Sequence, residues 1–248
     1  MSKTIFEHST PGRKGVVLPK REIDIPLATM FSETMLRTKK ARLPEVSELD
    51  TMRHYITLSH KNHFIEKGLY PLGSCTMKYN PKLHETLVRH PSFTSLHPYQ
   101  PEETLQGALE LMYELQQDLA EIAGMAGVTL QPSAGAQGEF TGIKIISAYH
   151  KAKGNTHKDT IIIPDSAHGT NPASCSLVGY KTVELASNKE GRCDIAKLRE
   201  LVNEKTAGIM ITNPNTLGLF ETQIEEIAAI IHSVDALMYM DGANLNAL

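Results

Sequence analysis

The chain has 248 residues, of which 41% are hydrophobic, and it carries a formal net charge of −3. A chain of this length and composition buries one large core or two smaller ones, as globular proteins do. Acidic and basic residues are interspersed, which argues against a nucleic-acid surface and against a polybasic attachment to membranes. The composition therefore favours a small molecule or another protein as the partner.

The three cysteines, Cys75, Cys175 and Cys193, are widely spaced and form no CxxC pair, so neither a disulfide framework nor a metal site is indicated. The opening residues are polar and contain no apolar segment of signal-peptide length. No stretch approaches the roughly 18 continuous apolar residues of a membrane span. These features predict a cytoplasmic protein without a membrane segment.

Residues 1–100 are predicted to form an N-terminal arm with short helices. Prolines interrupt this region repeatedly, and apolar periodicity rarely persists beyond two helical turns. An arm with so little regular structure is expected to pack over another surface, either the rest of this chain or a partner subunit. Partial disorder is the alternative interpretation.

Residues 101–248 have a different pattern, which predicts an α/β domain with a mainly parallel sheet. A helix is predicted over 101–124, and short β-rich runs then alternate with amphipathic helices. The predicted strands are 127–132, 159–164, 180–185, 207–213 and 236–240, and the predicted helices between them are 136–154, 171–179, 194–205 and 221–235. The apolar run Ile161-Ile162-Ile163 suits a strand that is covered on both faces.

The turn after the first predicted strand reads SAGAQGE, from Ser133 to Glu139. Ser133 can cap the helix that follows, and the amides of residues 134–137 would then be free at the positive end of the helix dipole. Such a terminus suits a phosphate group, although a Gly-rich turn between a strand and a helix is more often only a turn.

His168 follows the second predicted strand in the sequence PDSAHGTNPAS, where Thr170 or Asn171 is expected to cap a helix with Pro172 at its first position. Its ring can lie against a planar ligand or exchange protons near neutral pH. A lone histidine is, however, usually a surface residue.

Asn213, Asn215 and Thr216 follow the fourth predicted strand, and Asp241 follows the last. The first three can bind a ligand oxygen, or they can simply form an Asn-Pro turn. Asp241 can be a functional carboxylate or a strand-end residue that turns the chain. Ligands of open α/β sheets bind beyond the carboxyl ends of the strands, where all these residues are predicted to meet.

An anion-binding turn, a ring-stacking histidine, an Asn/Thr loop and a carboxylate together describe a site for a flat, phosphorylated nitrogen heterocycle. Pyridoxal 5'-phosphate is such a ligand, because it is a flat nitrogen heterocycle that carries a phosphate group. A carboxylate beside its pyridine nitrogen keeps that nitrogen protonated, so that the ring withdraws electrons from the substrate.

The sequence also resembles the P-protein family of the glycine cleavage system, most closely the N-terminal half of the second subunit in bacteria that divide this protein. The resemblance rests on KTIFEHSTPGRKG, YPLGSCTMKYNPK, HPYQPEETLQG, LQPSAGAQGE, DSAHGTNPAS and MDGANLNAL, which span nearly the whole chain. It implies a fold-type I pyridoxal-phosphate enzyme of the aspartate aminotransferase-like class. Such a protein decarboxylates glycine and transfers the aminomethyl group to the lipoyl group of the H-protein.

The resemblance assigns roles to individual residues. The cofactor phosphate would lie on the turn formed by Ser133, Ala134, Gly135, Ala136 and Gln137. His168 would stack on the ring, Thr216 or Asn213 would approach the ring hydroxyl, Asp241 would pair with the pyridine nitrogen, and Ala243 would pack beneath the ring. Ser74, Cys75 and Thr76 are assigned to the substrate side, where Cys75 is more plausibly a packing thiol than a nucleophile.

One feature departs from the family pattern. The family holds its cofactor as a Schiff base to a lysine that follows the strand-end aspartate, whereas the last lysine here is Lys205. The chain is therefore interpreted as a partial domain that lacks the later strands, this lysine and the small domain, and we expect it to be inactive alone. Residues 127–132 would then have no neighbouring strand and would leave backbone groups unpaired.

The resemblance implies three partners: a first P-protein subunit in a hetero-oligomer, the H-protein and glycine. Two alternatives stay open at this point. One is a different fold-type I enzyme, such as an amino-acid decarboxylase or a cysteine desulfurase. The other is a non-catalytic scaffold half that only binds a partner subunit.

Overall fold

The computed structural model describes residues 3–20, 22, 25–69 and 77–246. The chain separates into two compact units, 1–69 and 70–248, and each is described by itself. The division near residue 100 that the sequence pattern suggests stays a prediction. Ser74, Cys75 and Thr76 lie outside the described residues.

The first unit consists of short helices joined by extended segments. Its helices are η1 (Ile5–His8), α1 (Leu27–Met30), η2 (Glu33–Met35) and α2 (Glu48–Ser59). The expected short helices are therefore present, but the 12 residues of α2 make it longer than the weak periodicity suggested. Ser47 explains where α2 starts, because its side chain accepts from the backbone of Asp50 and the Asp50 carboxylate reaches back in a capping box.

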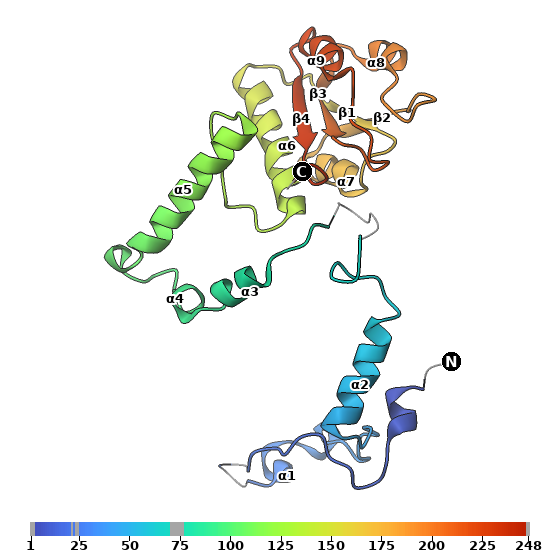
Figure 1. The fold of residues 1–248 in the computed structure, drawn as a ribbon. Helices are drawn as coiled ribbons and strands as arrows, with labels where there is room; N and C mark the ends of the chain where they lie inside the picture. The colour runs from blue at the N-terminus through green and yellow to red at the C-terminus, as the bar shows by residue number, and fades with distance from the viewer. Residues whose placement is uncertain (1–2, 21, 23–24, 70–76, 247–248) are drawn as a thin grey trace. The chain divides into compact units, whose positions relative to one another are not determined.

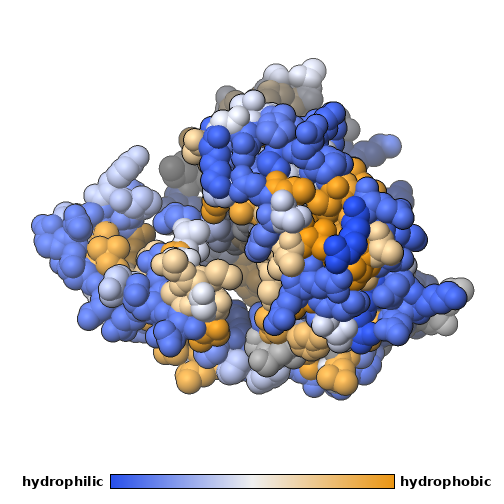
Figure 2. Space-filling model, turned by 90° about the horizontal axis from the view of Figure 1, so that it is seen from above, coloured by the Kyte–Doolittle hydropathy of each residue, from blue (hydrophilic) through white to orange (hydrophobic). Residues whose placement is uncertain are grey.

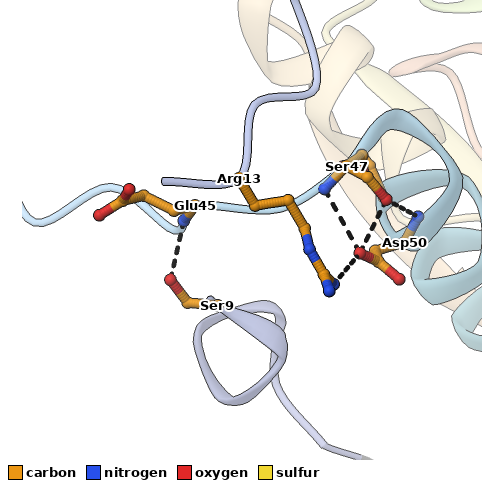
Figure 3. Close-up of polar contacts among 6 residues, drawn as sticks. Ser9, Arg13, Glu45, Ser47 and Asp50 are labelled. Atoms are coloured by element: carbon orange, nitrogen blue, oxygen red, sulfur yellow. Dashed lines mark hydrogen bonds and ion pairs between the residues drawn. The ribbon is translucent and has the colours of Figure 1, made fainter. Parts of the chain in front are cut away.

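Polar contacts connect the start of the first unit to the segment that precedes α2 and to the first turn of α2 (Figure 3). The Ser9 hydroxyl accepts from the backbone N–H of Glu45 at 2.8 Å. Arg13 forms an ion pair with Asp50, with 2.6 Å between Nη1 and Oδ2. None of the described residues in this unit is buried, so these contacts lie at the surface.

The second unit begins with helices that also remain exposed. They are α3 (Lys82–Val88), α4 (Pro91–Thr94), η3 (Glu102–Thr104) and α5 (Gln106–Ala123). The predicted helix over 101–124 is thus a 3-10 turn followed by α5, which ends at Gly124 in a left-handed conformation with φ 64°. No side chain of α5 is buried.

The sheet of the second unit has four parallel strands in the order β2-β1-β3-β4. The strands are β1 (Thr160–Pro164), β2 (Lys181–Leu185), β3 (Thr206–Thr212) and β4 (Leu237–Asp241). Helices α6 (Gly135–Ala152), α7 (Thr170–Val178), α8 (Ile195–Leu201) and α9 (Ile224–His232) accompany them. The alternating α/β pattern and the parallel sheet predicted from the sequence are confirmed (Figure 1).

Each face of the sheet carries its own hydrophobic core. Ile162 and Ile209 belong to one cluster together with residues of α8 and α9. Their neighbours Ile161 and Met210 belong to a second cluster, which includes residues of α6 and α7. Successive side chains of a strand point to opposite faces, so a continuous apolar run fills both cores.

The strand predicted at 127–132 is not formed in the described chain. The expectation that these residues have no neighbouring strand is confirmed, because the four strands of the sheet pair only with one another. The carbonyl of Val128 instead accepts from Nε2 of Gln116 at 2.8 Å. A strand exists only where a neighbour completes its ladder, and none of the described segments does so here.

Large hydrophobic side chains remain on the surface. Figure 2 shows hydrophobic residues, in orange, between hydrophilic ones on the face that it displays. In the first unit Val17 is 89% exposed, and on α5 Ile122 is 81% exposed. Among the described residues, none of the helices combines the length and hydrophobicity of a membrane-spanning helix.

Candidate functional site

The candidate site lies at the carboxyl edge of the sheet, where the loops after the strands meet. Thr212 of β3 is in register with Asp241 of β4, so these two parallel strands end side by side. The loop after β1 contains His168, and the loop after β3 contains Asn213 and Thr216. Asp241 is the last residue of β4, and the other three predicted residues follow strand ends at the same edge, as expected for ligand sites of such sheets.

Asp241 is 9% exposed and is held by two hydrogen-bond donors. Its Oδ1 accepts from the backbone N–H of Ala243 at 3.0 Å, and its Oδ2 accepts from Nδ2 of Asn171 at 3.2 Å. A buried carboxylate needs such donors, because desolvation penalises its charge. The short GAN turn after β4 thus holds the carboxylate at the sheet edge.

Glu139 is a second buried acid beside Asp241, and the sequence reasoning did not identify it as a site residue. It is 8% exposed, and its Oε2 accepts from Nδ2 of Asn171 at 3.0 Å and from the Ser174 hydroxyl at 3.4 Å. Burial raises the pKa of Glu139, and the charge of Asp241 raises it further, against the lowering effect of the two hydrogen bonds.

A sequence signal for Glu139 does exist. Glu139, Ile143, Ile146 and His150 are the buried residues of α6, and their spacing of four, three and four places them on one helical face. An acidic residue in phase with the apolar face of a helix is predicted to point into the core, where it needs a polar partner.

The N-terminus of α6 differs in detail from the sequence prediction. Ala134 is the N-cap and no side chain caps the helix, so the expected cap by Ser133 is wrong. The backbone N–H of Gln137 bonds to the carbonyl of Ala134 at 3.0 Å and is already engaged. Ser133, Ala134, Gly135, Ala136 and Gln137 are all exposed. In the described chain the backbone amides of Gly135 and Ala136 form no intramolecular hydrogen bond and stay available to an anion.

His168 is half-buried in the loop between β1 and α7. Its Nδ1 accepts from the backbone N–H of Thr170 at 3.3 Å, which fixes this nitrogen as the acceptor. The expected helix cap is wrong here too: Gly169 is the N-cap, and Pro172 stands third in the helix rather than first. Asn171 is not a cap because its side chain turns inward to the two carboxylates.

The loop after β3 is tied to the loop after β1. Thr216 donates its hydroxyl hydrogen to the carbonyl of Ser166 at 2.7 Å. Asn213 accepts at Oδ1 from the backbone N–H of Glu221 at 3.1 Å. Asn215 organises its own loop, since its Oδ1 accepts from Leu217 and Leu219. The bond from Thr216 to Ser166 therefore joins the two loops into one rim, while the other bonds fix the loop after β3.

The described end of the GSCTMK segment reaches the same edge. Nζ of Lys78 donates to the carbonyl of Asn244 at 2.8 Å, across 166 residues of sequence. Asn244 is 2% exposed and donates from Nδ2 to the carbonyl of Pro214 at 3.0 Å. Lys78 therefore lies at the rim, whereas the three substrate-side residues before it fall outside the described chain.

The two described cysteines are not suited to act as nucleophiles. Cys175 and Cys193 are both buried, and burial raises the pKa of each thiol to about 12. Such thiols are poor nucleophiles near neutral pH. Within the described ranges, no group of three His, Cys, Asp or Glu side chains has an arrangement suited to a metal ion.

Solved structures share the fold. A crystal structure of glycine decarboxylase, the P-protein of the glycine cleavage system, in inhibitor-bound form matches 86% of this chain with a TM-score of 0.62 at 24% identity, and 47% of that chain is covered. A sphingosine-1-phosphate lyase from Burkholderia pseudomallei matches 92% of this chain with a TM-score of 0.58 at 15% identity, and 49% of that chain is covered. These matches confirm the expected fold-type I architecture.

Curated relatives are more similar in sequence. A probable glycine dehydrogenase (decarboxylating) subunit 2 from Halalkalibacterium halodurans is 56% identical over 98% of this chain. The protein of the same description from Bacillus cytotoxicus is 54% identical over 98% of this chain. In both cases the chain spans 50% of the relative's length.

The family model described as glycine cleavage system P-protein matches residues 22–248. This match covers most of the chain, including every described residue of the candidate site. The family expected from the sequence motifs is therefore confirmed. The chain belongs to the glycine cleavage system P-protein family.

Proposed function

We propose that this chain forms part of a glycine dehydrogenase (decarboxylating), and that its sheet edge supplies one side of a pyridoxal-phosphate site. In the proposed reaction glycine is decarboxylated and its aminomethyl group passes to the lipoyl group of the H-protein. The family membership supports the reaction, and the buried Asp241 at the sheet edge is the observation that carries the site.

The residues at the rim fit this cofactor. The amides of Gly135 and Ala136 at the positive end of α6 suit a phosphate, and half-buried His168 offers a ring face to a planar group. Ala243, which follows Asp241 in the turn, is small enough to leave room beside the carboxylate. When bound, pyridoxal phosphate supplies a protonated ring that withdraws electrons from the α-carbon of the substrate.

Asp241 is proposed to hold the proton on the ring nitrogen. Its Oδ1 and Oδ2 each accept one hydrogen bond from the protein, which leaves further lone pairs for a ligand N–H. A carboxylate beside a pyridine nitrogen favours the protonated ring by charge attraction. This role explains why a buried acid lies where the strand ends.

Asn213 and Thr216 are proposed to face the ring hydroxyl. Thr216 already donates its hydroxyl hydrogen to Ser166, so it offers an acceptor. Asn213 uses Oδ1 inside the protein, and its Nδ2 remains as the donor. A deprotonated ring oxygen needs a donor, so the hydrogen bonding favours Asn213 for this contact.

The description of the relatives as subunit 2 supports a partner subunit for this chain as well. We propose a hetero-oligomer with a first P-protein subunit, which docks the H-protein jointly with this chain. Co-purification of the two subunits from a co-expressing host, with the single chains as controls, tests this assembly. Separate elution of the two subunits at micromolar concentration would contradict it.

Equilibrium binding of pyridoxal phosphate to the 248-residue chain tests the site itself. We expect saturable binding, and we expect Asp241→Asn to weaken it roughly tenfold or more because a neutral amide does not stabilise the protonated ring. Asp235→Asn is the matched control, since Asp235 precedes β4 at its opposite end and pairs with Lys153. Equal affinities of all three chains would rule out the role of Asp241.

A further inference from the structure

Two buried carboxylates share a single amide group on the inner side of the rim. Nδ2 of Asn171 lies 3.0 Å from Oε2 of Glu139 and 3.2 Å from Oδ2 of Asp241. Asn171 is 0% exposed, so solvent does not compete for these bonds. The three residues come from three elements, α6, α7 and β4, which meet at this point.

The hydrogen-bond chemistry fixes the orientation of this amide. An amide nitrogen carries two hydrogens, so it can satisfy two carboxylates, whereas the amide oxygen would be repelled by both. Oδ1 of Asn171 is buried and accepts no hydrogen bond from the described residues. An unsatisfied buried acceptor costs free energy. Asn171 therefore leaves its Oδ1 without a hydrogen bond so that its Nδ2 can donate to both acids.

The surroundings of Glu139 contain several other ionisable groups. Asp241 and Tyr239 face it from β4, Cys175 from α7 and His168 from the loop after β1. Burial raises the pKa of Tyr239 to about 12, so this group stays neutral. Apart from His168, the nearby ionisable groups are acidic, and the amide of Asn171 is the group that separates the two carboxylates.

We propose that Glu139 is a positioning residue for Asp241 and acts through Asn171. The proposal rests on the cofactor site proposed above. Glu139 accepts one N–H of the amide and thereby directs the other N–H at Oδ2 of Asp241, while the Ala243 amide holds Oδ1. The plane of the Asp241 carboxylate is fixed by these two donors, and its free lone pairs are presented to the ring nitrogen in one orientation.

The first test needs no cofactor and follows the side-chain amide hydrogens of Asn171 by NMR of the 15N-labelled chain. The signal is assigned by its loss in Asn171→Leu. We expect slow hydrogen exchange in the unaltered chain and in Glu139→Gln, whose side-chain oxygen still accepts. In Glu139→Met the acceptor is lost, and we expect exchange to accelerate roughly tenfold or more.

The second test measures equilibrium binding of pyridoxal phosphate to the same chains. We expect Glu139→Met to weaken binding about tenfold and Glu139→Gln to change it less than about threefold. The matched control is Ser174→Ala, which removes a contact to Glu139 without touching Asp241, and it should bind within about twofold of the unaltered chain. The double variant Glu139→Met/Asn171→Leu should bind no more weakly than Asn171→Leu alone, because the effect of Glu139 passes through Asn171.

The outcomes separate this proposal from the cofactor site. If the unaltered chain does not bind pyridoxal phosphate, the proposed function fails, while the NMR test still decides whether Glu139 positions the amide. If Glu139→Met leaves both amide exchange and affinity unchanged, the positioning role is overturned. If Glu139→Met does not fold, Asn171→Leu decides, and an unchanged affinity in that folded variant overturns the proposal.

Discussion

The residues before Glu139 and those after it differ in how they are held. Every buried residue of the described chain lies at or after Glu139, where a four-stranded sheet has a hydrophobic core on each face. The earlier residues are shaped by helix caps, turns and surface ion pairs such as Arg13–Asp50. Exposed ion pairs contribute little to stability. Local signals therefore suffice to form short helices, but only burial gives a region its own stability.

The residues before Glu139 expose large hydrophobic side chains that no other part of the described chain covers. Val17 and Ile122 expose most of their surface, and large exposed apolar surface in a protein marks a site of contact with another surface. The prediction that the arm packs over another surface is consistent with this exposure.

Truncation of a core side chain should have the largest effect. Ile162 on β1 is 0% exposed, so Ile162→Ala is expected to lower the free energy of unfolding by about 2–5 kcal/mol. Ile56→Ala on α2 is the matched control, because Ile56 is 48% exposed and should change it by less than about 0.5 kcal/mol. Urea unfolding followed by circular dichroism measures both. Equal losses would contradict the contrast between the two regions.

Two glycines of α6 should respond in opposite directions to the same substitution. A Cβ on Gly142 would overlap the ring of Tyr239, whereas nothing lies within 4 Å of a Cβ on Gly138. Gly142→Ala is therefore expected to destabilise by about 1–3 kcal/mol through overpacking. Gly138→Ala should stabilise by up to about 1 kcal/mol through helix propensity. Thermal unfolding of the two variants measures the difference, and a stabilised Gly142→Ala chain would show that α6 does not pack closely on β4.

Glu139 should give the core a specific pH dependence. Burial raises the pKa of Glu139 above its ordinary value of 4.5, so the folded state binds this proton more tightly than the unfolded state does. Its contribution to stability is therefore complete below pH 4.5 and is lost as the pH rises through its raised pKa. The stability of Glu139→Gln relative to the unaltered chain should accordingly increase over this range. A pH-independent difference in unfolding free energy would refute the inward placement of Glu139.

The smallest effect on the core is expected from a helix cap in the first unit. Ser47→Ala removes the capping box of α2 and should destabilise that helix by about 1 kcal/mol. Amide exchange within α2 should become faster, while urea unfolding of the sheet should not change. A matching shift of the sheet transition would show that the first unit unfolds together with the core.

Much of the fold could be predicted from local patterns. The continuous run Ile161-Ile162-Ile163 indicated a strand covered on both faces, and β1 contributes to both cores. The apolar pattern at 127–132 is typical of a strand, but no strand forms there because a strand needs a paired neighbour, as the expected lack of one implies. Sequence patterns therefore predict strands most reliably where the neighbouring strand is close in the chain.

In the candidate site too, local patterns predict some features, while tertiary contacts decide the others. Asp241, His168, Asn213 and Thr216 could be placed at one edge because parallel strands carry their loops there. The caps assigned to Ser133 and to Thr170 or Asn171 were wrong, since Asn171 turns inward to two buried acids instead. Glu139 could be predicted only from its helical phase, which it shares with the buried residues Ile143 and Ile146 of α6.

Asp241 is proposed to keep the ring nitrogen of pyridoxal phosphate protonated at this sheet edge. The most direct measurement is the 15N NMR signal of ring-labelled pyridoxal phosphate bound to the chain near neutral pH. We expect a protonated nitrogen in the unaltered chain and in Asp235→Asn, and an unprotonated one in Asp241→Asn. An unprotonated nitrogen in the unaltered chain, or an unchanged signal in Asp241→Asn, would overturn the proposed role of Asp241.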